Sequence, residues 1–201
     1  MNCIFIENAC IELPDPSPIN NATCRDPYDE VVPGINTDFA LGDWYVTHGY
    51  NWEYDCFDCQ ILSYGFPYNK PTQYGALYDL IAVNGTLIWN NVYQDGYETQ
   101  PGIITYQGIE GGLTNTQRFF FLINEIDTMM VYYCGDLLTW HFEGLLIMSK
   151  NPQLSSVYLP QITEKLDALG LSWDDLCALN PEQMCVNHPA VPPFPKTAVQ
   201  N

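Results

Sequence analysis

The stretch Asp55-Cys56-Phe57-Asp58-Cys59 places two thiols beside two carboxylates. Cysteines at this spacing form a redox couple, half of a zinc site, or the anchors of two separate disulfides. A zinc site of this kind needs a second closely spaced cysteine pair, which the sequence lacks, so no metal site is predicted. A thioredoxin-type couple lies where a strand turns into a helix of an α/β fold. Because Cys56 begins a strand pattern, we interpret the two cysteines as anchors of different disulfides.

Cysteines are frequent along the whole chain, and their number is even. In a chain of this kind, such usage predicts structural disulfides and an oxidising compartment. The residues expected to form these disulfides are Cys3, Cys10, Cys24, Cys56, Cys59, Cys134, Cys177 and Cys185.

The chain is strongly acidic, with 24 Asp and Glu residues against 6 Lys and Arg residues and a formal net charge of -18. Such a surface repels phosphate backbones, so nucleic acid is excluded as a partner. It also repels anionic membranes at neutral pH, and protonation of the carboxylates in an acidic compartment would remove that repulsion.

Strand signals dominate residues 38–151, where runs rich in Tyr, Val, Ile, Phe and Trp alternate with Gly, Asn and Pro. Asn84-Gly85 is typical of a tight hairpin turn. Eight strands separated by short turns indicate an up-and-down barrel, with an immunoglobulin-like sandwich as the alternative. The expected strands are 43–50, 56–64, 75–83, 86–93, 102–108, 117–124, 128–134 and 142–149.

The chain divides into three parts around this barrel. Residues 1–37 contain three cysteines and several prolines and are interpreted as an irregular, disulfide-tied N-terminal extension. Residues 38–151 form the barrel. In residues 152–201, Tyr158–Leu169 carries its apolar residues on one helical stripe, Ser172 begins a second short helix, and a Pro-rich tail follows.

Gly42-Asp43-Trp44 opens the first strand and resembles the G-x-W signature of lipocalins. In that family a cationic residue beyond the last strand packs over the tryptophan, and Lys150 is placed to do so. The eight-strand meander and the C-terminal helix strengthen the resemblance. It implies an all-β, eight-stranded antiparallel lipocalin barrel with a C-terminal helix.

A longer resemblance is to the violaxanthin de-epoxidase lipocalin domain. The segment Asp38–Gln60 is similar to the start of that domain, including its F-D-C-Q motif. The resemblance implies a xanthophyll or carotenoid ligand, ascorbate as reductant with no bound cofactor, and a location in the chloroplast thylakoid lumen. Further similar positions are Cys3-x6-Cys10, Gln100-Pro101-Gly102, Val131-Tyr132-Tyr133, Gly135 and Trp140.

The resemblance also implies disulfide partners. Cys59, the cysteine of the F-D-C-Q motif, would be tied to the C-terminal segment through Cys177 or Cys185. Cys56 and Cys134 match no family position and are expected to pair with each other. The remaining bonds would be shared by Cys3, Cys10 and Cys24.

Candidate site residues follow from the matched positions. Tyr133 and Asp58 are retained and are the expected catalytic residues. Asp55 and Asp58 are expected at the barrel mouth, where protonation of clustered acids would act as a pH switch. The catalytic aspartate of the family is absent from 115–120, where Arg118 stands beside its expected place. The expected ligand-binding residues are Trp89, Gln117, Phe119 and Trp140.

Two functions are consistent with the sequence. The first is a violaxanthin de-epoxidase-like lipocalin that binds an epoxy-xanthophyll and either de-epoxidises it or rearranges the epoxide. The second is a non-catalytic carotenoid-binding protein, or a lumenal accessory subunit of a photosynthetic membrane complex or thylakoid lipid surface. The missing aspartate favours the second, and the retained motifs around Asp58 and Tyr133 favour the first.

Overall fold

The computed structural model describes residues 3–6, 9–12, 24–52, 55–65, 73–82, 86–110, 113–137 and 140–185. For some of these residues only the backbone is described, namely 3–6, 9–12, 37, 73–82, 86–95, 97, 107–110, 113–116, 137 and 140.

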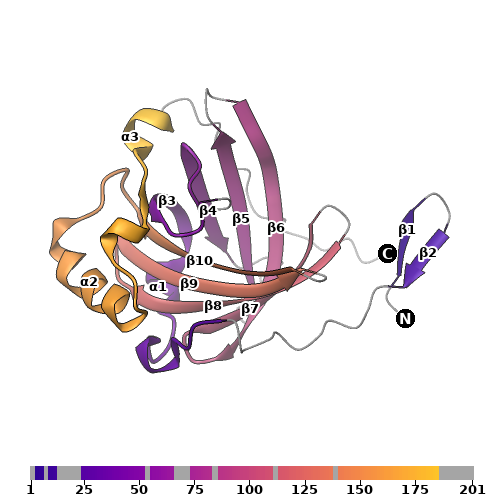
Figure 1. Cartoon of the computed structure of the whole chain (residues 1–201), viewed down its shortest axis with the longest axis horizontal. Helices are drawn as coiled ribbons and strands as arrows, with labels where there is room; N and C mark the ends of the chain where they lie inside the picture. Colours follow the sequence, from indigo (N-terminus) through magenta and orange to yellow (C-terminus); the bar gives the residue numbers. More distant parts are fainter. Residues whose placement is uncertain are drawn as a thin grey trace.

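Eight antiparallel strands form the predicted barrel (Figure 1). Each strand pairs with the next along the chain, and the last strand returns to pair with the first through Leu146–Gly49 and Ser149–Tyr45. The strands are β3 (Gly42–Gly49), β4 (Cys59–Gly65), β5 (Gln73–Ala82), β6 (Thr86–Gln100), β7 (Ile103–Glu110), β8 (Leu113–Asn124), β9 (Thr128–Leu137) and β10 (Trp140–Ser149).

Several strands differ from their predicted ranges. β8 begins at Leu113 rather than at Gln117, and β9 ends at Leu137 rather than at Cys134. β4 begins at Cys59 rather than at Cys56, because Cys56 is bonded to the C-terminal segment before the strand starts. β6 continues through Gly96 to Gln100, although glycine usually weakens a strand. Gly96 lies opposite Tyr106, and a Cβ at Gly96 would come within 2.5 Å of that ring, so the ring covers the glycine.

The barrel strands alternate between an inner and an outer apolar face. The inner cluster includes Trp44, Leu62, Phe119 and Tyr133. The outer cluster packs under α2 (Leu159–Ala168), which corresponds to the predicted helix and buries Ile162 and Leu166. Pro160 in its first turn suits the start of a helix, and Gly170, with φ +68°, ends it. The helix therefore covers one outer wall of the barrel.

Trp44 is fully buried near the start of β3, just after α1 (Thr37–Ala40). The indole Nε1 donates a hydrogen bond to the carbonyl oxygen of Ala40 at 2.8 Å. The Lys150 Nζ lies 4.1 Å from the centre of the Trp44 ring and also donates to the carbonyl of Leu41. The cation over the tryptophan is the arrangement expected from the lipocalin resemblance.

The flanking segments contain short elements. Near the N-terminus, β1 (Cys3–Ile6) and β2 (Ala9–Glu12) pair as a hairpin, which is a regular element within the extension that was interpreted as irregular. A 3-10 turn, η1 (Tyr28–Glu30), precedes the barrel. After α2 come η5 (Trp173–Asp175), β11 (Cys177–Ala178), which pairs with β3, and α3 (Pro181–Met184). The predicted second helix is thus a 3-10 turn, which starts with a capping box between Ser172 and Asp175.

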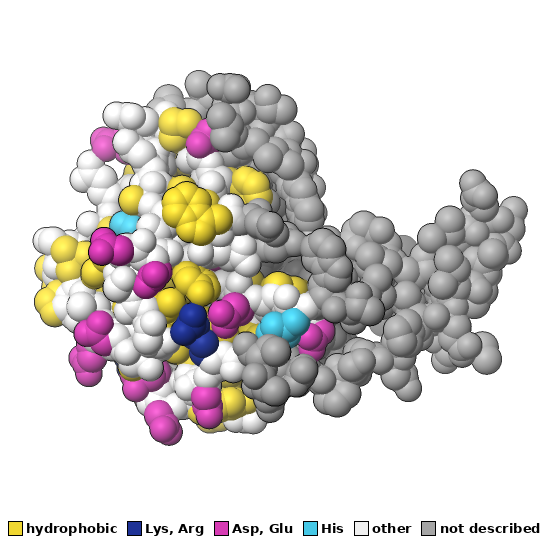
Figure 2. All heavy atoms as spheres, in the orientation of Figure 1, with side chains coloured by type: hydrophobic (Ala, Val, Ile, Leu, Met, Phe, Trp, Pro, Cys, Tyr) yellow, Lys and Arg dark blue, Asp and Glu magenta, His cyan; other side chains and the backbone are white. Residues whose placement is uncertain are grey.

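The described part of the chain has no helix with the length and apolar character that a membrane crossing needs. Asp and Glu side chains are scattered over the face in Figure 2, whereas Lys and Arg side chains occupy one small area of it. This distribution agrees with the net charge of -18.

Candidate functional site

A tyrosine and an aspartate meet on the inner face of the barrel. Tyr133 on β9 belongs to the inner apolar cluster, and its hydroxyl donates a hydrogen bond of 2.6 Å to Asp55 Oδ1. The other oxygen, Oδ2, accepts bonds from the backbone N–H of Asn51 at 2.9 Å and of Leu145 at 3.2 Å. Asp55 is only 1% exposed. The carboxyl group is therefore enclosed by donors and shielded from solvent.

Burial controls the protonation of this carboxyl group. Loss of hydration raises the pKa of Asp55 from 3.8 to about 7, although the bonds from Tyr133, Asn51 and Leu145 act in the opposite direction. A carboxyl group of this kind carries a proton in mildly acidic solution and loses it near neutrality. General acids work best when their pKa lies near the working pH. Asp55 with Tyr133 is therefore equipped to deliver a proton inside the barrel.

Two glycines make room for the pair. A Cβ on Gly49 would lie 2.5 Å from both the Cβ and the carbonyl oxygen of Asp55. A Cβ on Gly144 would lie 2.2 to 2.5 Å from atoms of the Tyr133 ring, which faces Gly144 across the β9–β10 ladder. Both distances are far below normal contact. Glycine at these two positions allows the loop and the ring to approach the sheet closely.

We predict that Gly144→Ala displaces the Tyr133 ring and lengthens its bond to Asp55. The added methyl group overpacks a buried site, so the free energy of unfolding should fall by about 1–3 kcal/mol. Urea unfolding measures this loss, and near-UV circular dichroism reports the altered tyrosine environment. Gly34→Ala is the matched control, because a Cβ there meets nothing within 4 Å. Equal stability of the two variants would contradict the packing of Tyr133 on Gly144.

Further buried polar atoms in the barrel interior have no hydrogen-bond partner among the described residues. Gln60 and Tyr64 are on β4 at the same parity as Leu62 of the inner cluster, so all three face inward. The Gln60 side-chain oxygen and the Tyr64 hydroxyl are buried. Neither forms a hydrogen bond with the described residues. Buried polar atoms without partners are costly, and in a binding site they commonly wait for a ligand. Burial also raises the pKa of Tyr64, which therefore stays a neutral hydroxyl.

The residues predicted to form the site lie in different surroundings in the structure. Tyr133 bonds to Asp55, whereas Asp58 is half-buried in the loop directly before β4. Phe119 is fully buried and stacks on Tyr133, with ring centres 5.5 Å apart. Gln117, two residues before Phe119 on β8, is buried on the same inner face. The side chains of the predicted ligand residues Trp89 and Trp140 lie outside the described part of the chain.

Arg118 does not point into the barrel. Its NH1 donates to the hydroxyl of Tyr28 at 2.9 Å, and its guanidinium lies 5.6 Å from the centre of the Phe120 ring. Phe120 belongs to the outer cluster, so Arg118 is on the outer face. Its neighbour Gln117 therefore occupies the inward position near the missing family aspartate.

Sequence reasoning placed Asp55 at the barrel mouth, whereas the structure buries it against Tyr133. The sequence signal that was missed is Gly49, a glycine that ends an otherwise regular strand six residues earlier. Gln60 was also missed, although its alternation with Leu62 and Tyr64 directs it inward.

Among the described residues, three disulfides connect distant parts of the chain. Cys59 is bonded to Cys185, one of its two expected partners. Cys56 is bonded to Cys177, and the expected bond between Cys56 and Cys134 was wrong.

The reason is the position of β11, which pairs Cys177 with Gly49 beside the Asp55 loop and so brings Cys177 to Cys56. Cys134 is bonded instead to Cys24. The side chains of Cys3 and Cys10 lie outside the described residues.

Comparison with known proteins identifies the architecture. Apocrustacyanin C1 has 18% sequence identity and a TM-score of 0.54, over 75% of this chain and 91% of its own. The bovine lipocalin allergen Bos d 2 has 12% identity and a TM-score of 0.57, over 79% of this chain and 100% of its own. The siderocalin Ex-FABP has 10% identity and a TM-score of 0.54, over 70% of this chain and 93% of its own. At these identities the likeness concerns the fold alone.

No curated protein matches the sequence. A family model, that of the VDE lipocalin domain, matches residues 1–180. The match spans the N-terminal hairpin, the whole barrel and α2, and so includes both Asp55 and Tyr133. The chain therefore belongs to the violaxanthin de-epoxidase (VDE) lipocalin domain family.

Proposed function

We propose that this ligand-binding lipocalin takes an epoxy-xanthophyll into its barrel and protonates the epoxide oxygen through Tyr133 and Asp55. The observation that carries the proposal is the Tyr133–Asp55 hydrogen bond, which lies on the inner face and includes a carboxyl group with a pKa of about 7. Aromatic rings at Tyr106, Phe119 and Tyr133 suit a long apolar polyene. Gln60 and Tyr64 offer free polar groups for an oxygen-bearing end ring.

The proton pathway follows from the state of Asp55. When Asp55 is ionised, the Tyr133 hydroxyl is held by the carboxylate. When Asp55 is protonated, it donates to the tyrosine oxygen, and the Tyr133 hydrogen becomes free for the ligand. Tyr133 then protonates the epoxide oxygen while Asp55 replaces the lost proton, which opens the ring at a C–O bond.

Completion of the reaction has two balanced forms. In de-epoxidation, ascorbate supplies two electrons and two protons, the oxygen leaves as water, and a carbon–carbon double bond forms. In rearrangement, the opened ring loses a proton from a neighbouring carbon and no reductant is consumed. Ascorbate would act as a diffusing reductant in the first form. The family aspartate would fall within 115–120, where the buried, inward-facing Gln117 is neutral, and this favours the rearrangement, which consumes no reductant.

The proposed compartment is the chloroplast thylakoid lumen. The disulfides suit an oxidising compartment. An acidic lumen would also protonate Asp55 and reduce the repulsion between the acidic surface and a thylakoid lipid surface. These two properties support the proposal without reference to a particular partner.

A second candidate function is non-catalytic binding of a carotenoid, including a role as an accessory subunit of a photosynthetic membrane complex. It is favoured by Gln117, an amide that cannot donate a proton as the family aspartate does. In this case Tyr133 and Asp55 would bind the oxygen of the pigment without transferring a proton.

Violaxanthin incubated with the protein, galactolipid and ascorbate, below and above pH 7, separates the two candidates when the pigments are followed by chromatography. Catalysis predicts product at acidic pH and a loss of about 100-fold or more in Tyr133→Phe, since general acids contribute on this scale. Tyr132→Phe is the matched control, because it removes a tyrosine hydroxyl that also donates to a carboxylate, Glu143, but belongs to the outer cluster. Unchanged pigment that elutes with the protein would support the binding function. A protein that neither converts nor retains the pigment would exclude both.

A further inference from the structure

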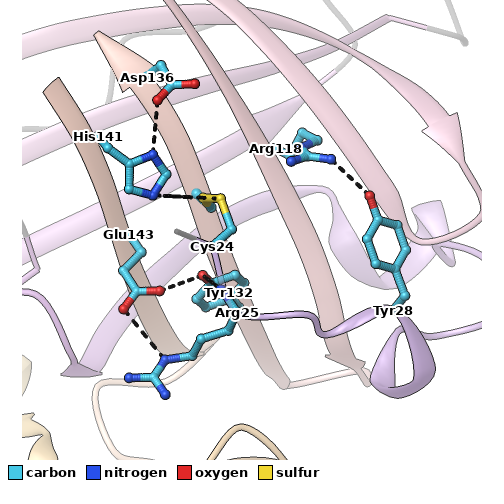
Figure 3. Close-up of a disulfide and its surroundings, with 9 residues drawn as sticks. Cys24, Arg25, Tyr28, Arg118, Tyr132, Asp136, His141 and Glu143 are labelled. Carbon is cyan, nitrogen blue, oxygen red and sulfur yellow. Dashed lines mark hydrogen bonds and ion pairs between the residues drawn. A yellow bond between two sulfur atoms is a disulfide. The ribbon is translucent and has the colours of Figure 1, made fainter. Parts of the chain in front are cut away.

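A second cluster of reactive side chains lies away from the barrel interior (Figure 3). His141 on β10 points its Nε2 at the disulfide between Cys24 and Cys134, with distances of 3.8 Å to Cys24 Sγ and 3.6 Å to Cys134 Sγ. The three atoms that could bind a metal ion lie within 4.8 Å of one another. Within the described residues, this is the single group of three or more such side chains.

Asp136 orients the histidine. Its Oδ1 lies 2.9 Å from His141 Nδ1, and this contact places the ring hydrogen on Nδ1 and leaves the lone pair of Nε2 facing the sulfurs. A carboxylate behind a histidine is the usual support for a histidine that ligates zinc. The second nitrogen is thus free for a metal ion on the side where the sulfurs lie.

Cys24 is held in place by contacts other than its disulfide. The adjacent Arg25 donates from its backbone N–H to the Tyr132 hydroxyl at 2.9 Å and from NH1 to the Leu169 carbonyl at 2.8 Å. Its Nε lies 3.5 Å from Glu143. Cys134 is fixed in β9, which pairs with strands on both sides. Opening the disulfide would therefore leave both thiols close to His141.

We propose that Cys24, Cys134 and His141 bind Zn²⁺ once a dithiol reductant has opened the disulfide. The dithiol is oxidised to its own disulfide, and Cys24 and Cys134 become thiols. Zn²⁺ then binds two thiolates and one imidazole, and two thiol protons are released to solvent. Two sulfurs and a nitrogen suit tetrahedral zinc, with the fourth position open to water.

Both reagents would reach the site from the side of Cys24 and His141, because Cys134 is fully buried. Cys24 is half-buried, and the side chains of His141 and Asp136 are 24% and 20% exposed. The sequence predicted no metal site because it lacks a second closely spaced cysteine pair, and Cys24 and Cys134 are separated by 110 residues. The fold alone brings them together with His141.

Cobalt, which replaces zinc and absorbs light when bound to thiolate, provides the test. Full-length protein treated with a mild dithiol and desalted without oxygen should develop a thiolate-to-cobalt absorption band, which Zn²⁺ then removes. Mass spectrometry after alkylation verifies that Cys24 and Cys134 are free thiols. The oxidised protein should give no band. Asp136→Asn should weaken binding by roughly 10–100-fold, and His141→Ala by more. Replacing Cys59 and Cys185 by Ser should leave the band unchanged.

A variant that cannot form the disulfide avoids reduction of the other cysteines. Cys24→His retains three ligands and should bind cobalt and zinc without reductant, whereas adding His141→Ala should abolish this binding. Circular dichroism shows whether both proteins are folded. No band in reduced protein with free Cys24 and Cys134, or no binding by folded Cys24→His, would overturn the proposal. Equal zinc affinity of His141→Ala and the unchanged protein would also overturn it.

Discussion

Replacing Asp55 by Asn should remove a pH-dependent contribution to stability that is concentrated between about pH 4 and pH 7. Folding raises the pKa of Asp55 from 3.8 to about 7, chiefly through burial. Between these values the folded protein keeps the proton and the unfolded chain releases it. The folded state thus binds more protons, so the free energy of unfolding falls as the pH rises through this window. The pKa difference corresponds to at most about 4 kcal/mol.

The Asp55→Asn variant lacks this pH-dependent contribution, but its free energy of unfolding is lowered by an amount that does not depend on pH. An Asn amide that still accepts from Tyr133 turns its NH₂ toward the N–H groups of Asn51 and Leu145. Unsatisfied buried donors cost about 1–3 kcal/mol. Urea unfolding of both proteins at several pH values should therefore give a stability advantage of the unchanged protein that is largest in acid. That advantage should decrease up to about pH 7 and stay constant above it.

Tyr133→Phe is the informative comparison for this measurement. It keeps the carboxyl group but removes a hydrogen bond that lowers the pKa of Asp55. The pH window should persist and extend to higher pH. If the difference between Asp55→Asn and the unchanged protein does not vary with pH, then Asp55 does not titrate in the folded state as described, and the proposed proton donor loses its basis.

The strands of the barrel were predictable because each carries its own signal. Alternation of inward and outward residues is local, as at Gln60, Leu62 and Tyr64, and turns such as Asn84-Gly85 mark where it stops. Strand ends were less predictable where a distant contact intervenes. Because Cys56 is bonded to Cys177, β4 starts later than predicted. Because the Tyr106 ring covers Gly96, β6 continues past that glycine.

The candidate site was less predictable because burial of a loop residue depends on tertiary contacts. Asp55 and Asp58 occupy similar sequence contexts, yet only Asp55 is enclosed. The difference arises from Gly49, which lets the loop approach β3, and from Cys177, which covers it from β11. The approach of His141 to Cys24 likewise depends on tertiary structure, because the disulfide to Cys134 brings the N-terminal segment onto the β9–β10 ladder. Neither contact has a signature within one segment of the sequence.

The disulfide that covers Asp55 provides the second large expected effect. Replacing Cys56 and Cys177 together by Ala should lower the free energy of unfolding by about 4–5 kcal/mol, because the bond joins residues 121 apart and restricts the unfolded chain. Thermal and urea unfolding without reductant measure the loss. The replacement should also admit water to Asp55, since the Cys177 Sγ lies 3.3 Å from the Gly49 carbonyl and 4.0 Å from that of Asp55.

Replacing Cys59 and Cys185 by Ala is the matched control, because that bond joins residues 126 apart and has nearly the same effect on the unfolded chain. Both double variants should lose similar stability. Only the Cys56 and Cys177 replacement should shift the pH window of Asp55 downward, because hydration reverses the burial that raises its pKa. An equal shift in both would mean that general loosening of the barrel, rather than the cover provided by Cys177, sets the protonation of Asp55.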